Sequence, residues 1–329
     1  MGIKMRLLQS NDEEYFLDCI DELYSTIEKN QAEFNTTRVL VKHSRFKSFL
    51  VRKLILIPSL FKFQPKLKKN EIVNFVSMIS GDFRLLIPYA FSSRLNYIYM
   101  YDVWPRFHKW IFPLLDFFNV KCVFFSSKQV FEIFNTQYSH IKCKALWLPE
   151  ALSAQDYSFK NYNDRDIDVL EFGRMYDDYH SRITETLKLK GKKHIYRTAA
   201  MDFLFPDKPS FTNALASAKI VICVPSNITH PDRSEFISSM TLRYLQAMVS
   251  KCLIIGVLPL DMEEVFGYNP IVEIEMEHAA EQILNLLENY NDYKALIEKN
   301  YQHVIQHHQW QNRWEIMSQK IKEGHNGIS

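Results

Sequence analysis

The chain has 329 residues, of which 47% are hydrophobic and 24% charged, and its 40 basic and 38 acidic side chains give a formal net charge of +2. This composition excludes a disordered or low-complexity protein, and the length indicates two packed domains. The five cysteines lie far apart without a CxxC spacing, and no apolar run of about 18 residues occurs. We therefore expect a reduced, cytoplasmic protein that does not span a membrane.

Charge is unevenly distributed along the chain. The stretch 34–70 contains ten Lys or Arg residues and no Asp or Glu. Aromatic and aliphatic residues alternate with these bases, as they do in surfaces that bind anionic lipid or single-stranded nucleic acid. No recognised nucleic-acid motif accompanies the stretch, so we expect no nucleic-acid partner. Two interpretations stay open: a peripheral contact with an anionic membrane surface, or amphipathic elements whose lysines are solvated.

The first half of the chain alternates short apolar runs with helical patterns. The runs predict strands at 39–41, 54–57, 85–87, 97–101 and 122–125, and the pattern at 111–118 predicts a helix. Several of the strands are apolar on both faces, which is typical of a parallel sheet that helices cover on both sides.

Two aspartates of this half are candidate catalytic residues. Asp82 follows Gly81 in a turn, and Asp102 ends a predicted strand beside Trp104 and Pro105. A carboxylate in such a place suits binding of an acceptor sugar, or removal of a proton from its hydroxyl. Asp102 equally suits the cap of a helix that begins near Pro105.

The second half predicts another α/β domain. The polar segment 153–166 is rich in turn formers and is the best candidate for a linker between domains at 1–155 and 156–300. Strands are predicted at 167–172, 194–196, 219–224 and 253–255, and helices at 181–189, 212–218, 241–248, 277–288 and 293–306. We expect two Rossmann-like, doubly wound parallel sheets that face each other across a cleft, with the ligand at the carboxyl ends of the strands.

The eight glycines exclude two large classes of nucleotide-binding protein. They are so dispersed that neither GxGxxG nor GxxxxGK[ST] occurs, which argues against classical dinucleotide enzymes and P-loop NTPases. Gly173 and Arg174 directly follow a predicted strand. A glycine there permits close backbone approach to a ligand and the arginine offers a bidentate fork, although a simple turn with a solvated arginine fits as well.

The segment 234–256 runs from a polar loop through an amphipathic helix into a short apolar strand. The free N–H groups and positive dipole of the helix face the preceding loop, which suits a phosphate. Glu235, Thr241 and Arg243 lie at or near the amino end of this helix, and His230 lies in the loop before it. They offer a carboxylate, a hydroxyl, a guanidinium and an imidazole to a nucleotide-sugar. The alternative is a solvated loop followed by a core helix.

Two patterns resemble metal sites, and we interpret neither as one. Asp164, Asp166 and Asp168 form overlapping DxD patterns that precede a strand, whereas metal-holding carboxylates of that type follow a strand end. His303 and His307 lie one helical turn apart without a third convincing ligand, so we interpret them as part of a solvated helix face. We therefore expect neither a metal nor another cofactor.

Several segments together resemble cytoplasmic bacterial glycosyltransferases of the GT-B fold, of the surface-polysaccharide type. The likeness covers mainly 168–314 and rests on DVLEFGRMYDDYH, THP, TLRYLQAM with CLIIG, DMEEVFGYNPIVEI and HQWQNRW. It implies that the second domain binds a nucleotide-diphosphate-sugar donor and the first an acceptor, either a glycan or a lipid-linked glycan, with no required metal. It also implies that a C-terminal helix at 301–329 crosses back to the first domain.

Carried onto this sequence, the resemblance implies a role for each candidate residue. Gly173 and Arg174 would approach the donor diphosphate, His230 and Glu235 would contact the sugar or ribose, and Thr241 and Arg243 would lie by the phosphates. The catalytic candidates are Asp102, Asp82 and Glu235. Many retaining relatives have acids where this chain has Gln246 and Ser238. The alternatives are another nucleotide-sugar GT-B enzyme, such as an epimerase, and a non-catalytic membrane- or nucleic-acid-binding protein that uses the stretch 34–70.

Overall fold

The computed structural model describes residues 2–10, 18–30, 32–41, 70–87, 89–198 and 203–327. These residues form two compact units, one made of Met1–Pro149 with Trp310–Ser329 and the other of Glu150–Gln309. The expected ranges were 1–155, 156–300 and 301–329. The observed division precedes the polar segment 153–166 because Arg165, which is buried, donates to the carbonyl oxygens of Ala218 and Ser250 inside unit 2.

Unit 1 contains a six-stranded sheet in the order β2-β1-β3-β4-β5-β6, and every neighbouring pair is parallel. The strands are β1 (Ile3–Ser10), β2 (Phe34–Val41), β3 (Val73–Ile79), β4 (Leu95–Tyr101), β5 (Val120–Phe125) and β6 (Lys144–Trp147). The helices are α1 (Asp18–Lys29), α3 (His108–Phe117), α4 (Lys128–Gln137) and α13 (Trp310–Asn326), with short 3-10 turns η3 (Phe83–Leu85) and η4 (Pro105–Phe107).

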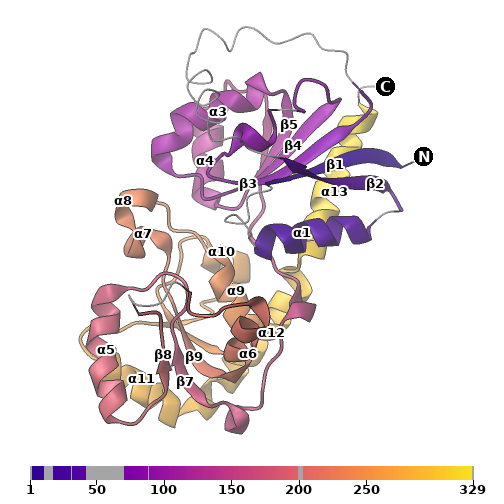
Figure 1. The fold of residues 1–329 in the computed structure, drawn as a ribbon. Helices are drawn as coiled ribbons and strands as arrows, with labels where there is room; N and C mark the ends of the chain where they lie inside the picture. The colour runs from indigo at the N-terminus through magenta and orange to yellow at the C-terminus, as the bar shows by residue number, and fades with distance from the viewer. Residues whose placement is uncertain are drawn as a thin grey trace. The chain divides into compact units, whose positions relative to one another are not determined.

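Aromatic residues join the helices of unit 1 to both faces of its sheet. Phe112 of α3 packs edge-on against Phe125 of β5 at 5.8 Å between ring centroids. The ring of Trp314 in α13 lies 5.1 Å from Phe34 and 6.4 Å from Phe75. Figure 1 shows α13, in yellow, beside α1 and the strands of this unit. Helix α13, at the end of the chain, therefore completes the core of unit 1.

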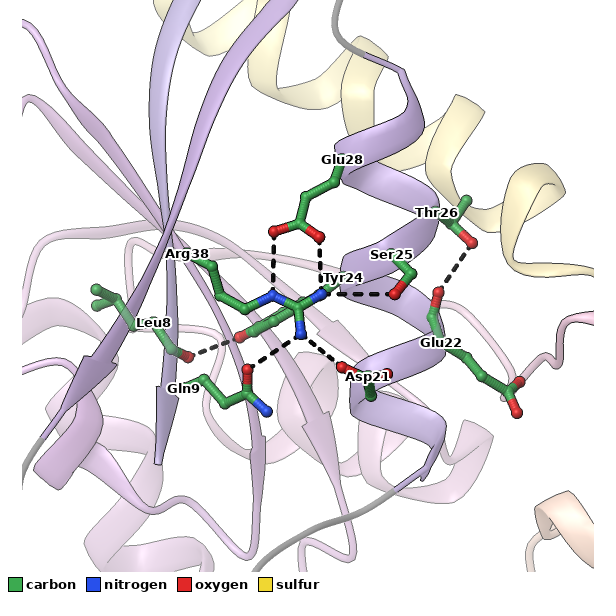
Figure 2. Close-up of polar contacts among 9 residues, drawn as sticks. All are labelled: Leu8, Gln9, Asp21, Glu22, Tyr24, Ser25, Thr26, Glu28 and Arg38. Carbon is green, nitrogen blue, oxygen red and sulfur yellow. Dashed lines mark hydrogen bonds and ion pairs between the residues drawn. The ribbon is translucent and has the colours of Figure 1, made fainter. Parts of the chain in front are cut away.

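Arg38 fastens the outer strand β2 to helix α1 (Figure 2). Its Nε and Nη2 donate to the carboxylate of Glu28 at 3.0 and 2.8 Å, and Nη1 donates to Asp21 at 2.5 Å. The guanidinium also lies over the ring of Tyr24, whose hydroxyl donates to the carbonyl oxygen of Leu8 at 2.7 Å. Burial opposes the charge of Arg38, but the hydrogen bonds to the two carboxylates raise its pKa.

Unit 2 contains a five-stranded parallel sheet in the order β11-β10-β9-β7-β8. The strands are β7 (Ile167–Leu170), β8 (His194–Ile195), β9 (Ala218–Cys223), β10 (Leu253–Gly256) and β11 (Val272–Glu273). The helices are α5 (Asp177–Leu189), α6 (Lys208–Ser217), α7 (Ser226–Thr229), α8 (Pro231–Ser234), α9 (Leu242–Val249), α10 (Met262–Phe266), α11 (Ala279–Glu288) and α12 (Lys294–His307). The 3-10 turns are η5 (Ala154–Asp156), η6 (Tyr162–Asp164) and η7 (Tyr290–Tyr293).

Alternate residues of β9 explain why helices cover both faces of this sheet. Ile220 and Ile222 belong to a core that includes Ile183 of α5 and residues of α11. Val221 and Cys223 belong to a separate core with residues of α6, α9, α10 and α12. Because successive side chains of a strand point to opposite faces, an apolar run such as this one requires a cover on each side. The prediction of doubly wound α/β domains is confirmed.

Most predicted elements are present, and two differences are clear. The strand predicted at 85–87 is wrong, because the chain there forms η3 and a turn. Strands β1, β3, β6 and β11 were not predicted. The strand predicted at 54–57, and most of the basic stretch 34–70, lie outside the described residues. Within the described part of the chain, no helix has the length and apolar character needed to cross a membrane.

Candidate active site

The loops at the carboxyl edge of the unit 2 sheet carry most of the predicted donor-site residues. Strands β7 and β9 are parallel neighbours, so the loops that follow them lie at the same edge. The first loop holds Gly173 and Arg174, and the second leads into α7 and α8, around His230. In a doubly wound sheet this edge is where ligands bind.

Gly173 is required by its conformation and by its neighbour. Its φ of +74° lies in the left-handed region, which disfavours any residue with a side chain. A Cβ atom built at this position would lie 3.0 Å from Cδ of Arg243. The expectation was that a ligand would approach the backbone here, and in the structure the stem of Arg243 does so.

Arg243 joins the two loops through backbone carbonyl groups. Its Nη2 donates to the carbonyl oxygen of Val224 at 2.6 Å, directly after β9. Its Nη1 donates to the carbonyl oxygens of Arg174 at 3.0 Å and Phe172 at 3.4 Å, after β7. Part of the guanidinium therefore positions the loops, which is a role that the sequence did not indicate.

Positive charge gathers around His230. The Nη1 atom of Arg174 donates to the hydroxyl of Ser226 at the start of α7. Loss of water contact, and then the charges of Arg174 and Arg233, lower the pKa of His230, with Arg243 adding to the effect and Asp177 opposing it. The imidazole consequently stays neutral to lower pH, and the arginines form an electropositive edge.

Glu235 has an unusual backbone conformation directly after α8. Its φ is +53° and its ψ is −120°, a region that residues other than glycine rarely occupy. Its N–H donates to the carbonyl oxygen of Pro231 at 2.8 Å, which closes the short helix. A conformation of this kind costs on the order of 1–3 kcal/mol and occurs most often at functional sites. The exposed Glu235 therefore remains a candidate contact for a donor.

The carboxylate of Glu150 occupies the amino end of α9. The N–H group of Leu242 donates to a carboxylate oxygen of Glu150 at 3.0 Å. The sequence predicted that this end would face a phosphate. Glu150 lies 92 residues earlier in the chain, and no sequence pattern indicated that it would reach α9.

Hydroxyl or amide oxygens of three residues near this edge are buried without a partner among the described residues: Asn227, Thr229 and Thr241.

Gln246 and Ser238 are both buried in unit 2. The amide nitrogen of Gln246 donates to the hydroxyl of Tyr157 at 2.9 Å. A neutral amide forms this contact without placing a charge in the interior, where a carboxylate would need a partner.

In unit 1, Asp82 and Asp102 follow neighbouring strands, β3 and β4. Both oxygens of Asp82 accept from Arg84, at 2.6 Å from Nε and 2.5 Å from Nη2. Asp102 has a left-handed φ of +49°, and its carbonyl oxygen accepts from the Ser80 hydroxyl at 3.0 Å. The idea that Asp102 caps a helix near Pro105 is wrong, because Trp104 occupies that position.

The two patterns that resembled metal sites have structural partners. Asp166 pairs with Lys193 at 2.5 Å, and Asp168 pairs with Lys219 at 2.7 Å and accepts from the Lys193 N–H. These contacts place the acids at the entry to β7, as predicted. His303 packs beside the ring of Phe266 at 4.7 Å between centroids, and burial lowers its pKa. That ring is therefore a packing element rather than part of a solvated face.

No model of a known protein family matches the chain, and no curated protein is similar enough to count as a relative. Solved structures do match over almost its whole length. Sucrose-phosphate synthase from Thermosynechococcus elongatus has a TM-score of 0.61 at 10% identity, covering 97% of this chain and 98% of its own. HepE from Anabaena, in complex with UDP and glucose, has a TM-score of 0.59 at 9% identity, covering 98% and 100%.

A glycosyltransferase from Rickettsia africae is similar to the same extent, with a TM-score of 0.57 at 10% identity over 98% of this chain and 99% of its own. Identities this low establish a shared fold. The chain thus has the GT-B fold of these glycosyltransferases, as the resemblance in its sequence implied.

Proposed function

We propose that the chain is a glycosyltransferase that moves a sugar from a nucleotide-diphosphate-sugar donor to a hydroxyl of a glycan or lipid-linked glycan. The observation that carries the proposal is the position of Arg174 and Arg243 at the carboxyl edge of the unit 2 sheet, where Arg174 contacts Ser226 and Arg243 joins the loops after β7 and β9. The fold supports it, since HepE has that fold and binds UDP and glucose. The role in surface polysaccharide synthesis, such as O-antigen or capsule, rests on the sequence resemblance.

The chemistry follows from where charge develops during transfer. As the bond between donor sugar and diphosphate breaks, negative charge grows on the leaving phosphate. Arg174 and Arg233 would stabilise that charge, and Arg243 would keep their loops in place. These groups would therefore stabilise the transition state more than the ground state. Because guanidinium groups supply this charge, we propose that transfer needs no metal.

The acceptor side of the proposal falls on unit 1. Asp102 is a better candidate general base than Asp82, because both carboxylate oxygens of Asp82 already accept from Arg84. Neutral His230 and Glu235 would hydrogen-bond to donor hydroxyl groups. A peripheral contact with the inner face of a membrane, through the stretch 34–70, remains part of the proposal for a lipid-linked acceptor.

A thermal-shift panel of UDP, GDP, dTDP and CMP sugars tests the proposal, since a ligand of the native state raises its stability by RT ln(1 + [L]/Kd). We expect one nucleotide class to stabilise the protein, and Arg174→Ala to lower turnover roughly 10²–10³-fold. Arg182→Ala is the matched control, because that arginine pairs with Asp178 on the exposed surface of α5. Absence of stabilisation across the panel would contradict the proposal.

A further inference from the structure

A second cluster of ionisable side chains lies in unit 2, apart from the arginines. Glu171 directly follows β7, His180 lies in α5, and His194 begins β8. Oε1 of Glu171 is 2.7 Å from Nδ1 of His180 and 2.8 Å from Nε2 of His194. The three ligand atoms lie within 4.8 Å of one another, and the side chains of Glu171, His180 and His194 are 5%, 15% and 4% exposed. One carboxylate and two imidazoles thus converge on one buried point.

Thr184 orients the ring of His180 for this arrangement. The Thr184 hydroxyl donates to the His180 carbonyl oxygen at 2.7 Å, so its oxygen accepts from Nε2–H of the ring at 3.2 Å. A neutral imidazole with its proton on Nε2 directs the lone pair of Nδ1 toward Glu171. Two lone pairs at that distance repel, so a positive species belongs between them, either a proton or a metal ion.

The donor set selects among metal ions. Two imidazole nitrogens and one carboxylate oxygen are ligands that suit Zn²⁺, which takes water as a fourth ligand, whereas Mg²⁺ and Ca²⁺ prefer oxygen alone. Tetrahedral zinc with bonds of about 2.0–2.1 Å separates its ligand atoms by about 3.3 Å. The histidine nitrogens would move from the carboxylate oxygen by about 0.5 Å, and the two nitrogens, which lie within 4.8 Å of each other, would also come to about 3.3 Å apart.

We propose that Glu171, His180 and His194 bind a Zn²⁺ ion that fastens β8 to β7 and α5. Strand β8 has two residues and lies at the edge of the sheet, where its attachment to β7 includes a hydrogen bond from the Glu171 N–H to the Ile195 carbonyl oxygen at 2.9 Å. An ion shared by three elements would strengthen this weakly held edge. The site is structural and goes beyond the proposed transfer reaction.

The surroundings also bear on the strength of binding. His180 has an outer partner in Thr184, whereas Nδ1 of His194 is buried without a partner among the described residues. Outer hydrogen bonds of this kind change metal affinity by about 10–100-fold. We therefore expect the site to bind zinc more weakly than one in which every ligand is supported, and the test uses micromolar zinc.

The test measures zinc directly on the full chain. After chelation and equilibrium dialysis against micromolar Zn²⁺, the wild-type protein should retain one ion per chain. Its melting temperature should rise by roughly 5 °C at zinc concentrations well above Kd, and Co²⁺ should give the intense visible absorption of a tetrahedral site. His180→Gln should lose both zinc retention and the thermal shift, and so should Glu171→Gln, which keeps a hydrogen-bonding oxygen but loses the charge.

His307→Gln is the matched control, because His303 and His307 form another close histidine pair of unit 2, with ring centroids 4.8 Å apart. This variant should bind zinc like the wild type. No zinc on the wild-type protein would leave a proton between Glu171 and His180, and would overturn the proposal. Equal retention by His180→Gln, or loss of zinc in His307→Gln, would also overturn it. Should His180→Gln fail to fold, Glu171→Gln decides the result.

Discussion

Replacing Arg243 with lysine keeps the positive charge at the edge of unit 2 but removes the planar group that joins two loops. Nη2 contacts the Val224 carbonyl oxygen at 2.6 Å on one loop, and Nη1 contacts that of Arg174 at 3.0 Å on the other. A lysine ammonium is a compact point charge and cannot span both carbonyls in this way. Arg243→Lys therefore separates the contribution of charge from that of geometry.

The expected loss follows from these contacts. A hydrogen bond from a charged donor contributes about 1.5–3 kcal/mol. Arg243 is only half-buried, so water compensates in part, and we take the lower end of that range for the loop contact that lysine cannot make. The free energy of unfolding should fall by about 1.5 kcal/mol, which lowers the melting temperature of a domain of this size by roughly 3–6 °C.

Two measurements check this reasoning. Differential scanning calorimetry gives the stability, and calorimetric titration gives the affinity for whichever nucleotide stabilises the wild-type protein best. We expect both to fall in Arg243→Lys and neither to change in Arg182→Lys, where the exposed pair with Asp178 contributes little. An Arg243→Lys protein with unchanged stability and affinity would show that charge alone matters at this position, and the positioning role would be refuted.

Three further predictions concern the same edge. Gly173→Ala should lower the free energy of unfolding by about 1–2 kcal/mol in urea titration, because alanine disfavours a left-handed φ; an unchanged midpoint would contradict this. His230 should titrate by NMR below its ordinary pKa of about 6.5, and Arg174→Ala should raise that pKa, because a positive charge that opposes protonation is removed. Since this pKa is lowered in the folded state, its contribution to stability is present above the unfolded-state value and is lost as pH falls through the folded-state value. Glu150→Gln should leave donor affinity within about threefold while lowering stability by about 0.3–1 kcal/mol, and a tenfold gain in affinity would place a phosphate at α9 instead.

Several buried strands of the two sheets were predictable because their signal is local. The continuous apolar runs in β4, β5, β9 and β10 indicate burial on both faces of the sheet, and most of these residues are buried in the structure. The run at 85–87 has the same composition but follows Asp82, whose carboxylate accepts from the Arg84 N–H and so favours a 3-10 turn. Apolar content thus predicts burial more reliably than it predicts the type of element.

The candidate site was predictable where its residues follow a strand, as Gly173 and Arg174 do. Contacts over long sequence separations were not. Glu150 reaches the amino end of α9 from 92 residues away, and Glu171 meets His194 across 23 residues. Neither pair forms a motif, since their spacing depends on the lengths of the intervening helices and loops. The sequence therefore indicated which residues gather at this edge of the sheet without indicating how their side chains are paired.

The contact between Glu150 and α9 bears on where a donor phosphate would bind. A phosphate at that helix end would lie beside the carboxylate, and two unit charges of like sign 4 Å apart repel by about 4 kcal/mol at an effective dielectric constant of about 20. Near Arg174 and Arg233 the same phosphate meets charges of opposite sign, whose presence the lowered pKa of His230 already reflects. Binding at the arginines therefore avoids the cost of displacing Glu150. For that reason we propose that the diphosphate binds at the arginines, while the carboxylate of Glu150 caps the amino end of α9.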